Sequence, residues 1–289
     1  MEYNNILVHV PESAHRQPLL DTAFELSATF DAYITGLHVH VPSYHEYVAP
    51  GSYPHAPLAE TVAQKDEEAR QLDAALRTSF EQRASHAGIK RTEWRYQQGV
   101  LGDTHIASAI AAHAQTADLV IMGQYDLQDR ACQVDYDTPA LVAMNSAPPI
   151  LIVPRTGRWR RVGRRIMLAW DGSREAAAVA NAALPLLQRA DAVTAVVVEE
   201  KKHRTAANGT RPCTEIVDCL ARRGVEVSLT RQPGDRSSVS DILLATLADS
   251  RADLLCMGVY GHTRLRERIF GGTTYDMLHK SSVPTLIAC

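Results

Sequence analysis

Residues 117–125 read ADLVIMGQY, and residues 252–260 read ADLLCMGVY. Each copy is a short apolar run that ends at a glycine. Such a run, apolar on both faces, is typical of a buried strand in a parallel sheet. The apolar run at 148–153 has a second copy at 283–288 in the same way. Because the copies occupy corresponding places in the two halves, the chain is interpreted as a duplication.

Working outward from this stretch, five apolar runs occur in the same order in each half. They fall at 6–10, 34–41, 92–96, 119–122 and 150–153, and again at 166–170, 193–198, 225–229, 254–257 and 285–288. Segments with helical periodicity lie between them, the longest at 58–88, where Gly88 suits the position just after a helix end. The pattern predicts an α/β fold made of two tandem five-stranded, doubly wound parallel sheets. We expect two separate sheets, with the last strand of each half at an edge that invites pairing.

Composition bounds the class of protein. The 289 residues suit two domains of about 150 residues each, expected at 1–154 and 165–289. With 45% hydrophobic and 22% charged residues, the chain is not disordered, and its apolar runs are too short for a membrane span. The start shows no signal peptide, and five scattered cysteines indicate reduced thiols, so we expect a cytoplasmic protein. A net charge of −3 gives no general attraction to nucleic acid or anionic lipid.

Two irregular stretches interrupt the pattern. The linker at 155–164 and its flank are strongly basic, which fits either a nucleic-acid patch or a solvated linker, and we expect the latter. Its arginines are Arg155, Arg158, Arg160, Arg161, Arg164 and Arg165. The stretch 42–57 holds four prolines and predicts a loop after the second strand, either a lid or an insertion.

Glycines and threonines follow the fourth strand of the second half. Gly258 and Gly261 come first, and Gly271, Gly272, Thr273 and Thr274 open a predicted helix. In an open parallel sheet, ligands bind outside the carboxyl ends of the strands. Glycines there let backbone N–H groups approach a phosphate, and a helix N-terminus favours an anion. The threonine hydroxyls fit either phosphate contacts or simple helix capping.

The spacing Gly258-x2-Gly261-x9-Gly271 resembles the nucleotide-binding signature of the universal stress protein family. Two copies of that family's Rossmann-like, adenine nucleotide alpha hydrolase-like fold would cover nearly all of the chain. The resemblance implies that Asp171 contacts the adenine-ribose end of a nucleotide and that Ala169, Val198 and Met257 flank the adenine. It implies ATP or another adenine nucleotide as ligand, with or without Mg²⁺. It also implies that the two halves pack as a pseudo-dimer about an approximate two-fold axis, and a further homodimer stays open.

One position departs from the family pattern. Gly272 stands where the family has serine or threonine, so one hydroxyl ligand is lost unless Thr273 or Thr274 replaces it.

The first half has the same order of predicted strands and helices but different side chains at the positions of the nucleotide-binding signature. Gly123 is retained, but Asp126, Tyr136 and Asp137 replace Gly261, Gly271 and Gly272, with Asp135 adjacent, and Pro11 replaces Asp171. A carboxylate about 5 Å from a phosphate charge costs roughly 3 kcal/mol at an effective dielectric near 20. Helix-terminus contributions of about 0.3–1 kcal/mol do not offset this cost. We therefore expect nucleotide only in the second half.

Other candidate groups are less specific. His9, His38 and His40 lie on the first two strands, where they could hold a metal ion together with the nearby carboxylates. We expect hydrogen-bonded structural histidines instead. Cys213 and Cys219 are expected to be free thiols. Between the glycines of the second half, Arg264, Arg266 and Arg268 either lean over phosphates or lie in a solvated loop.

These observations favour a binding and signalling module that acts through unidentified protein partners. The chain contains no Gly-x4-Gly-Lys-[Ser/Thr] loop, no Gly-x-Ser-x-Gly elbow and no His-Glu-x-x-His helix. An enzyme is therefore not expected beyond a slow ATPase, in which Asp171 or a threonine positions Mg²⁺ or water. A nucleotide-free scaffold is the third hypothesis.

Overall fold

The computed structural model describes residues 2–13, 16–40, 56–98, 106–125, 129, 134–157, 159, 161–199, 215–234, 237–259 and 272–289, with backbone alone at 56–62. The described elements of the first half are β1 (Asn5–His9), α1 (Arg16–Phe30), β2 (Tyr33–His40), α2 (Ala56–His86), β3 (Thr92–Gln98), α3 (Ile106–Ala114), β4 (Leu119–Gly123), α4 (Thr138–Asn145) and β5 (Ile150–Val153). Those of the second half are β6 (Arg165–Ala169), α5 (Arg174–Ala182), α6 (Leu184–Leu187), β7 (Ala192–Glu199), α7 (Glu215–Ala221), β8 (Val227–Pro233), α8 (Val239–Ser250), β9 (Leu254–Gly258), α9 (Gly272–Lys280) and β10 (Thr285–Ala288).

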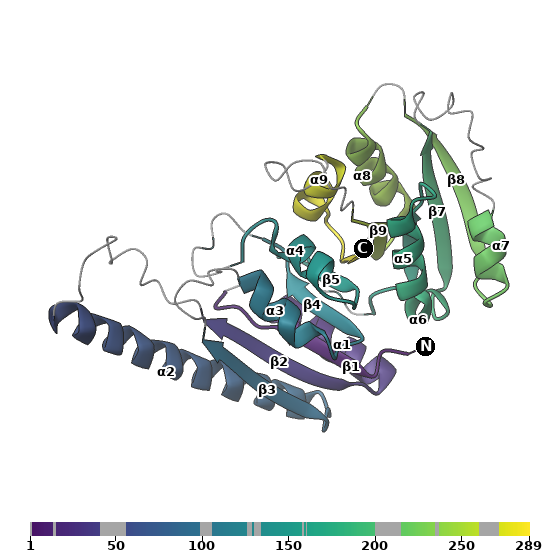
Figure 1. Ribbon diagram of the computed structural model, residues 1–289. Helices are drawn as coiled ribbons and strands as arrows, with labels where there is room; N and C mark the ends of the chain where they lie inside the picture. Colours follow the sequence, from purple (N-terminus) through teal and green to yellow (C-terminus); the bar gives the residue numbers. More distant parts are fainter. Residues whose placement is uncertain are drawn as a thin grey trace.

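The strands form one ten-stranded sheet in the order β3-β2-β1-β4-β5-β10-β9-β6-β7-β8 (Figure 1). Within each half the five strands are parallel, so the predicted fold class is confirmed. The expectation of two separate sheets is wrong, because β5 and β10 pair antiparallel and join the halves. Both strands are buried along their whole length, and pairing covers edges that would otherwise be open to other chains.

The register of this central pair reveals the symmetry of the molecule. Leu151 lies opposite Leu286, Ile150 opposite Ile287 and Ile152 opposite Thr285. Leu151 and Leu286 also occupy the same position in the repeated segments 148–153 and 283–288. An approximate two-fold axis therefore passes through this pair, as expected for an intrachain pseudo-dimer.

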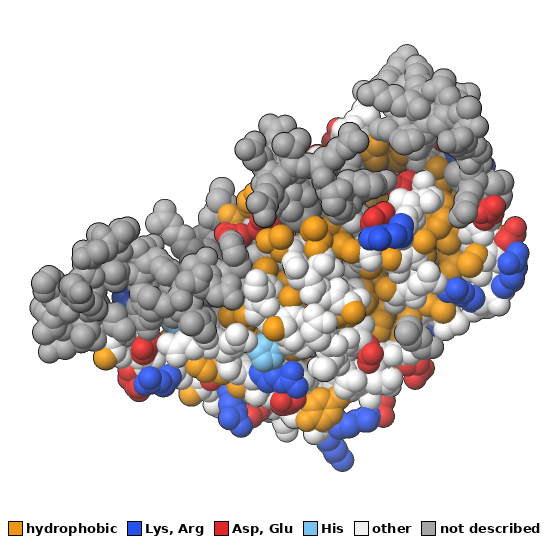
Figure 2. Space-filling model, in the orientation of Figure 1, with side chains coloured by type: hydrophobic (Ala, Val, Ile, Leu, Met, Phe, Trp, Pro, Cys, Tyr) orange, Lys and Arg blue, Asp and Glu red, His pale blue; other side chains and the backbone are white. Residues whose placement is uncertain are grey.

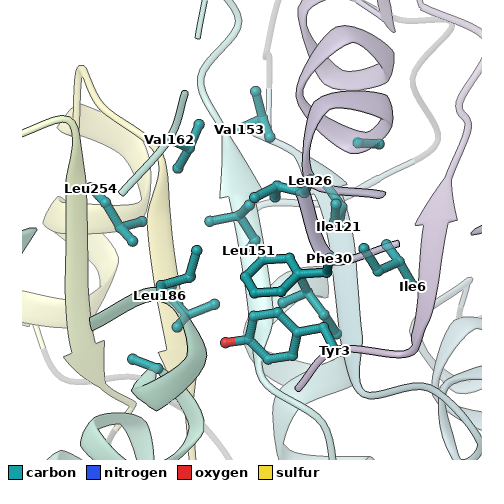
Figure 3. Close-up of a cluster of buried hydrophobic side chains, with 14 of the residues drawn as sticks. Tyr3, Ile6, Leu26, Phe30, Ile121, Leu151, Val153, Val162, Leu186 and Leu254 are labelled. Atoms are coloured by element: carbon teal, nitrogen blue, oxygen red, sulfur yellow. The ribbon is translucent and has the colours of Figure 1, made fainter. Parts of the chain in front are cut away.

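The hydrophobic core of the described residues consists of two clusters, one on each face of the sheet. The clusters do not correspond to the two halves of the chain. Alternate residues of one strand belong to different clusters: Val8 lies in the first and Leu7 in the second. Each cluster draws residues from both halves. Figure 3 shows part of the first cluster, where Tyr3 and Phe30 pack edge to face with ring centroids 5.0 Å apart and Leu186 lies across the boundary.

Polar contacts also tie the two halves together. The Tyr3 hydroxyl donates to the carbonyl oxygen of Ala182 in α5 at 2.7 Å, and burial raises the pKa of this phenol. The Arg189 guanidinium, which follows α6, donates to the carboxylate of Glu2 at 3.0 Å. The halves therefore share both apolar and polar interfaces.

Local signals explain the ends of two helices. Helix α2 ends two residues before Gly88, which has the predicted left-handed conformation with φ of +74°. Helix α5 begins after Ser173, whose hydroxyl accepts from the Ala176 N–H at 3.1 Å.

The linker differs from the solvated segment that its charge suggested. Val162 and Gly163 are buried, and Trp159 packs against the first cluster. The apolar residues between the arginines thus belong to the core, because they bridge α1 and α6 at the boundary of the halves. On the face shown in Figure 2, described basic side chains lie among acidic ones and do not form a single patch. Across the described ranges, no helix is long and apolar enough to cross a membrane.

Candidate functional site

The predicted adenine-flanking residues lie at the carboxyl ends of three adjacent strands. Ala169 ends β6, Val198 lies near the end of β7, and Met257 precedes the last residue of β9. Strand β6 pairs with β7 on one side and with β9 on the other. The structure therefore brings these residues together at the switch point of the second-half sheet, where ligands of this architecture bind. We call the set of Ala169, Asp171, Val198, Met257, Gly258 and Gly272 the second-half site.

Asp171 is held at the rim of this site by the turn that follows β6. Its Oδ1 accepts the N–H of Ser173 at 2.9 Å, and Gly172 between them has φ of +76°. The Asp171 side chain is exposed. The turn thus fixes a carboxylate at the surface, next to the N-terminus of α5.

The structure shows why position 258 requires glycine, which the sequence alone does not reveal. A Cβ at this position would lie 2.6 Å from the backbone carbon of Glu175 and 2.7 Å from the Ala176 nitrogen. The end of β9 therefore packs directly on the first turn of α5, and only glycine allows this approach. At the equivalent Gly123 of the first half, an added Cβ would meet nothing within 4 Å.

The predicted phosphate helix exists and begins at Gly272. Gly272 is exposed, and a Cβ there would meet no atom of the described residues within 4 Å. Thr273 is half-buried, whereas Thr274 is 1% exposed and packs in the core. Of the two threonines, Thr273 is therefore the better placed to replace the missing hydroxyl. Gly261 and Gly271 lie outside the described residues, as do Arg264, Arg266 and Arg268.

The matching place in the first half is closed. The registers of β1 with β4 and of β6 with β9 put His9 where Ala169 stands in the second half. His9 is 1% exposed and Pro11 is buried. The cavity that His9, Pro11, His38 and His40 help to line measures about 10 Å³. This is room for about one water molecule and not for a nucleotide.

The histidines of this first-half site differ in their bonding. His38 Nδ1 lies 3.0 Å from Asp73 Oδ1, to which the Trp94 indole N–H also donates, so the expectation of a hydrogen-bonded structural histidine holds for His38. It is wrong for His9, whose two ring nitrogens are buried without a hydrogen-bond partner in the described part of the chain. Burial, with a smaller effect of His38, lowers the pKa of His9 to about 3, and burial also lowers the pKa of His40.

Metal and thiol chemistry find no support in the described residues. No group of three His, Cys, Asp or Glu within them is arranged to hold a metal ion. Cys219, Cys256 and Cys289 are free, and burial raises the pKa of Cys256 and Cys289, which makes them poor nucleophiles. Cys132, Cys213 and Asp126 lie outside the described ranges.

Three described first-half residues, Gln124, Tyr125 and Tyr136, contact α9, the helix of the second-half site; the ring centroids of Tyr125 and His279 are 5.9 Å apart. Tyr136, which stands where the second half has Gly271, is 47% exposed and packs with Tyr275 and His279 at centroid distances of 5.6 and 6.1 Å. Gln124 Nε2 lies 3.0–3.2 Å from three carbonyl oxygens at the end of α9, those of Leu278, His279 and Ser281. Sequence reasoning missed Gln124, because nothing local marks a residue whose partners lie more than 150 positions away.

Solved structures share this architecture at low sequence identity. A universal stress protein from Archaeoglobus fulgidus DSM 4304 superposes with a TM-score of 0.69 at 17% identity, over 99% of this chain and 96% of that one. A functionally unknown protein from Pseudomonas aeruginosa PAO1 gives a TM-score of 0.59 at 14% identity, over 99% and 92%. These similarities establish the fold.

Sequence comparisons identify the family. "Universal stress protein Slr1230" from Synechocystis sp. (strain ATCC 27184 / PCC 6803 / Kazusa) is 47% identical over 38 residues, so the match spans 13% of this chain and 13% of that protein. The model of the universal stress protein family matches the chain twice, at residues 2–154 and 163–288. The chain therefore belongs to the universal stress protein family, in a tandem arrangement of two family domains.

Proposed function

We propose that this tandem universal stress protein binds an adenine nucleotide, ATP or a close relative, at the second-half site and signals its bound state to protein partners. The observation that carries the proposal is the difference between the two equivalent sites. The second half presents Ala169 and Asp171, where the first half presents His9 and Pro11. Ala169 leaves space at the end of its strand, whereas the buried imidazole of His9 fills the equivalent space in the first half.

The start of α9 supports a phosphate position. Its first residue, Gly272, is exposed, and no described residue lies within 4 Å of a Cβ built there. The N–H groups of a first helical turn have no partner within the helix, so they suit an anion. The first half has Asp137 at this point, before α4. A carboxylate there repels phosphate by roughly 3 kcal/mol at 5 Å. The proposed stoichiometry is therefore one nucleotide per chain.

Two substitutions of Gly272 test the position of the phosphates. Neither disturbs the packing of the described residues, because none of them lies within 4 Å of the new Cβ. Gly272→Ser restores the hydroxyl of the family pattern and should tighten ATP binding. Gly272→Asp copies the first half and should weaken it by about 100-fold, from roughly 3 kcal/mol of repulsion.

Calorimetry of the two variants and the wild type, with ATP and with and without Mg²⁺, measures both effects and the stoichiometry. Nucleotide released from the purified, denatured protein and identified by mass defines the natural ligand. Two equivalents per chain, or equal affinity in both variants, would show that the site is misplaced. Absence of any nucleotide binding would favour the scaffold hypothesis, whereas phosphate release that Gly272→Asp abolishes would favour the slow ATPase.

A further inference from the structure

A second cavity opens at the boundary between the two halves, away from the second-half site. Its volume is about 260 Å³, close to the lower end of small-molecule pockets. Glu25 and Thr29 of α1, linker residues 161–164, Leu186 of α6 and Arg189 line it. In Figure 3, Val162 and Leu186 lie on the second-half side of the buried boundary, across from Phe30 of α1. The cavity is thus built jointly by the first half, the linker and the second half.

Three arginines, Arg161, Arg164 and Arg189, are among the residues that line this cavity. Arg164 is paired with Asp191, and Arg189 with Glu2 at 3.0 Å. The carboxylates of Asp191 and Glu2 are 55% and 57% exposed, so these are surface ion pairs of about 0–1 kcal/mol. Arg189 also donates to the Pro185 carbonyl oxygen at 3.3 Å and stacks over the Phe30 ring at 4.6 Å. Because each guanidinium carries five N–H groups, these bonds among the described residues use only part of its donors.

Glu25 of α1 is the acidic residue among the described residues that line the cavity. Its Oε2 lies 3.4 Å from the Val162 N–H, and burial raises the pKa of its carboxyl group. This carboxyl is therefore more easily neutralised than that of an ordinary exposed glutamate. Beside three arginines, it offers a hydrogen-bond partner for a hydroxyl group.

We propose that this inter-half cavity binds a small hydroxylated organic anion with at least two negative charges, carried by phosphate or carboxylate groups. The guanidinium groups hold the charged oxygens, since an arginine fork matches both oxyanions in bidentate geometry. Glu25 contacts the hydroxyl of the ligand. A ligand seated here touches α1, the linker and α6, so it stabilises the two halves in their joined arrangement.

Arg161 permits a substitution that spares the fold. Arg161 has φ of +69°, a conformation that favours glycine, so Arg161→Gly removes the guanidinium and relieves backbone strain together. Arg251→Gly is the matched control. Arg251 is also exposed, has φ of +52° at the end of α8 and does not line the cavity. Both variants lose one positive charge.

The experiment is calorimetry with glycerol 3-phosphate and, separately, citrate at constant ionic strength, which tells phosphate from carboxylate recognition. We expect the Kd of the preferred anion to be unchanged in Arg251→Gly and to rise about tenfold or more in Arg161→Gly, as for the loss of charge-assisted hydrogen bonds. Glu25→Gln, which removes the opposing charge but keeps the shape, should bind more tightly. Gly272→Asp should bind these anions like the wild type, which separates this cavity from the second-half site.

Two results would overturn the proposal. One is that neither anion binds the wild type at millimolar concentration. The other is that Arg161→Gly and Arg251→Gly lose the same affinity, which would reveal a general charge effect. Urea unfolding of each variant without ligand checks that a loss of binding does not come from a loss of folding.

Discussion

Replacing His9 with leucine should make the protein markedly more resistant to acid. In the folded chain, burial and the neighbouring His38 lower the pKa of His9 from 6.5 to about 3. The unfolded chain therefore binds a proton between these two pH values that the folded chain does not bind. Above pH 6.5, His9 is neutral in both states and does not lower the free energy of unfolding. As the pH falls from 6.5 toward 3, proton uptake by the unfolded chain alone lowers the free energy of unfolding. At about pH 4.5 the loss amounts to about 3 kcal/mol, from two pH units at roughly 1.4 kcal/mol each.

The assay is urea unfolding at about pH 7.5 and about pH 4.5 for the wild type and His9→Leu, with acid-induced loss as the readout. All other titrating groups are shared by both proteins and cancel in the comparison. His86→Leu, at the exposed end of α2, is the control and should lose as much stability as the wild type. If His9→Leu and the wild type lose equal stability, then His9 carries a proton or a partner in the folded state and the burial argument fails.

Two further substitutions test the packing around the second-half site. Gly258→Ala should cost about 1–3 kcal/mol of unfolding free energy, because its Cβ meets the backbone of Glu175 at 2.6 Å, whereas Gly123→Ala should stay within about 0.5 kcal/mol. Equal unfolding midpoints for the two variants would contradict the close approach of β9 to α5. Gln124→Ala should cost about 1–2 kcal/mol and speed hydrogen exchange in α9, while Gln115→Ala, which loses one exposed bond to the Asn145 carbonyl, should leave exchange in α9 unchanged.

The sequence predicted most strands well because they are apolar on both faces and bounded by polar residues. The outermost strands, β3 and β8, are only partly buried. The predicted run at 119–122 and the observed β4 at Leu119–Gly123 differ by one residue. Gly88 likewise marked the end of α2 through a local conformational requirement. Features that depend on a few neighbouring residues could therefore be predicted without a structure.

Contacts between segments that are distant in the sequence could not be predicted from local patterns. The burial of His9 depends on β1 lying between β2 and β4, and the need for glycine at 258 depends on α5, which begins 84 positions earlier. The prediction of a solvated linker fails for a related reason. Its arginines dominate the composition, but Val162 and Trp159 decide where the segment lies, because the apolar boundary between the halves is beside them.

The degenerate first half has a physical role that its lost glycines conceal. Because Leu151 and Leu286 meet on the pseudo-two-fold axis, α4 and α9 lie close to the boundary, and α4 also contacts β10. Gln124 then reaches the last carbonyls of α9, and Tyr136 packs on Tyr275 near its start. Tyr136, which stands at the place of one phosphate glycine, and Gln124 therefore brace the helix that carries the proposed phosphate position in the other half. These side chains join the first half to that helix by direct contact.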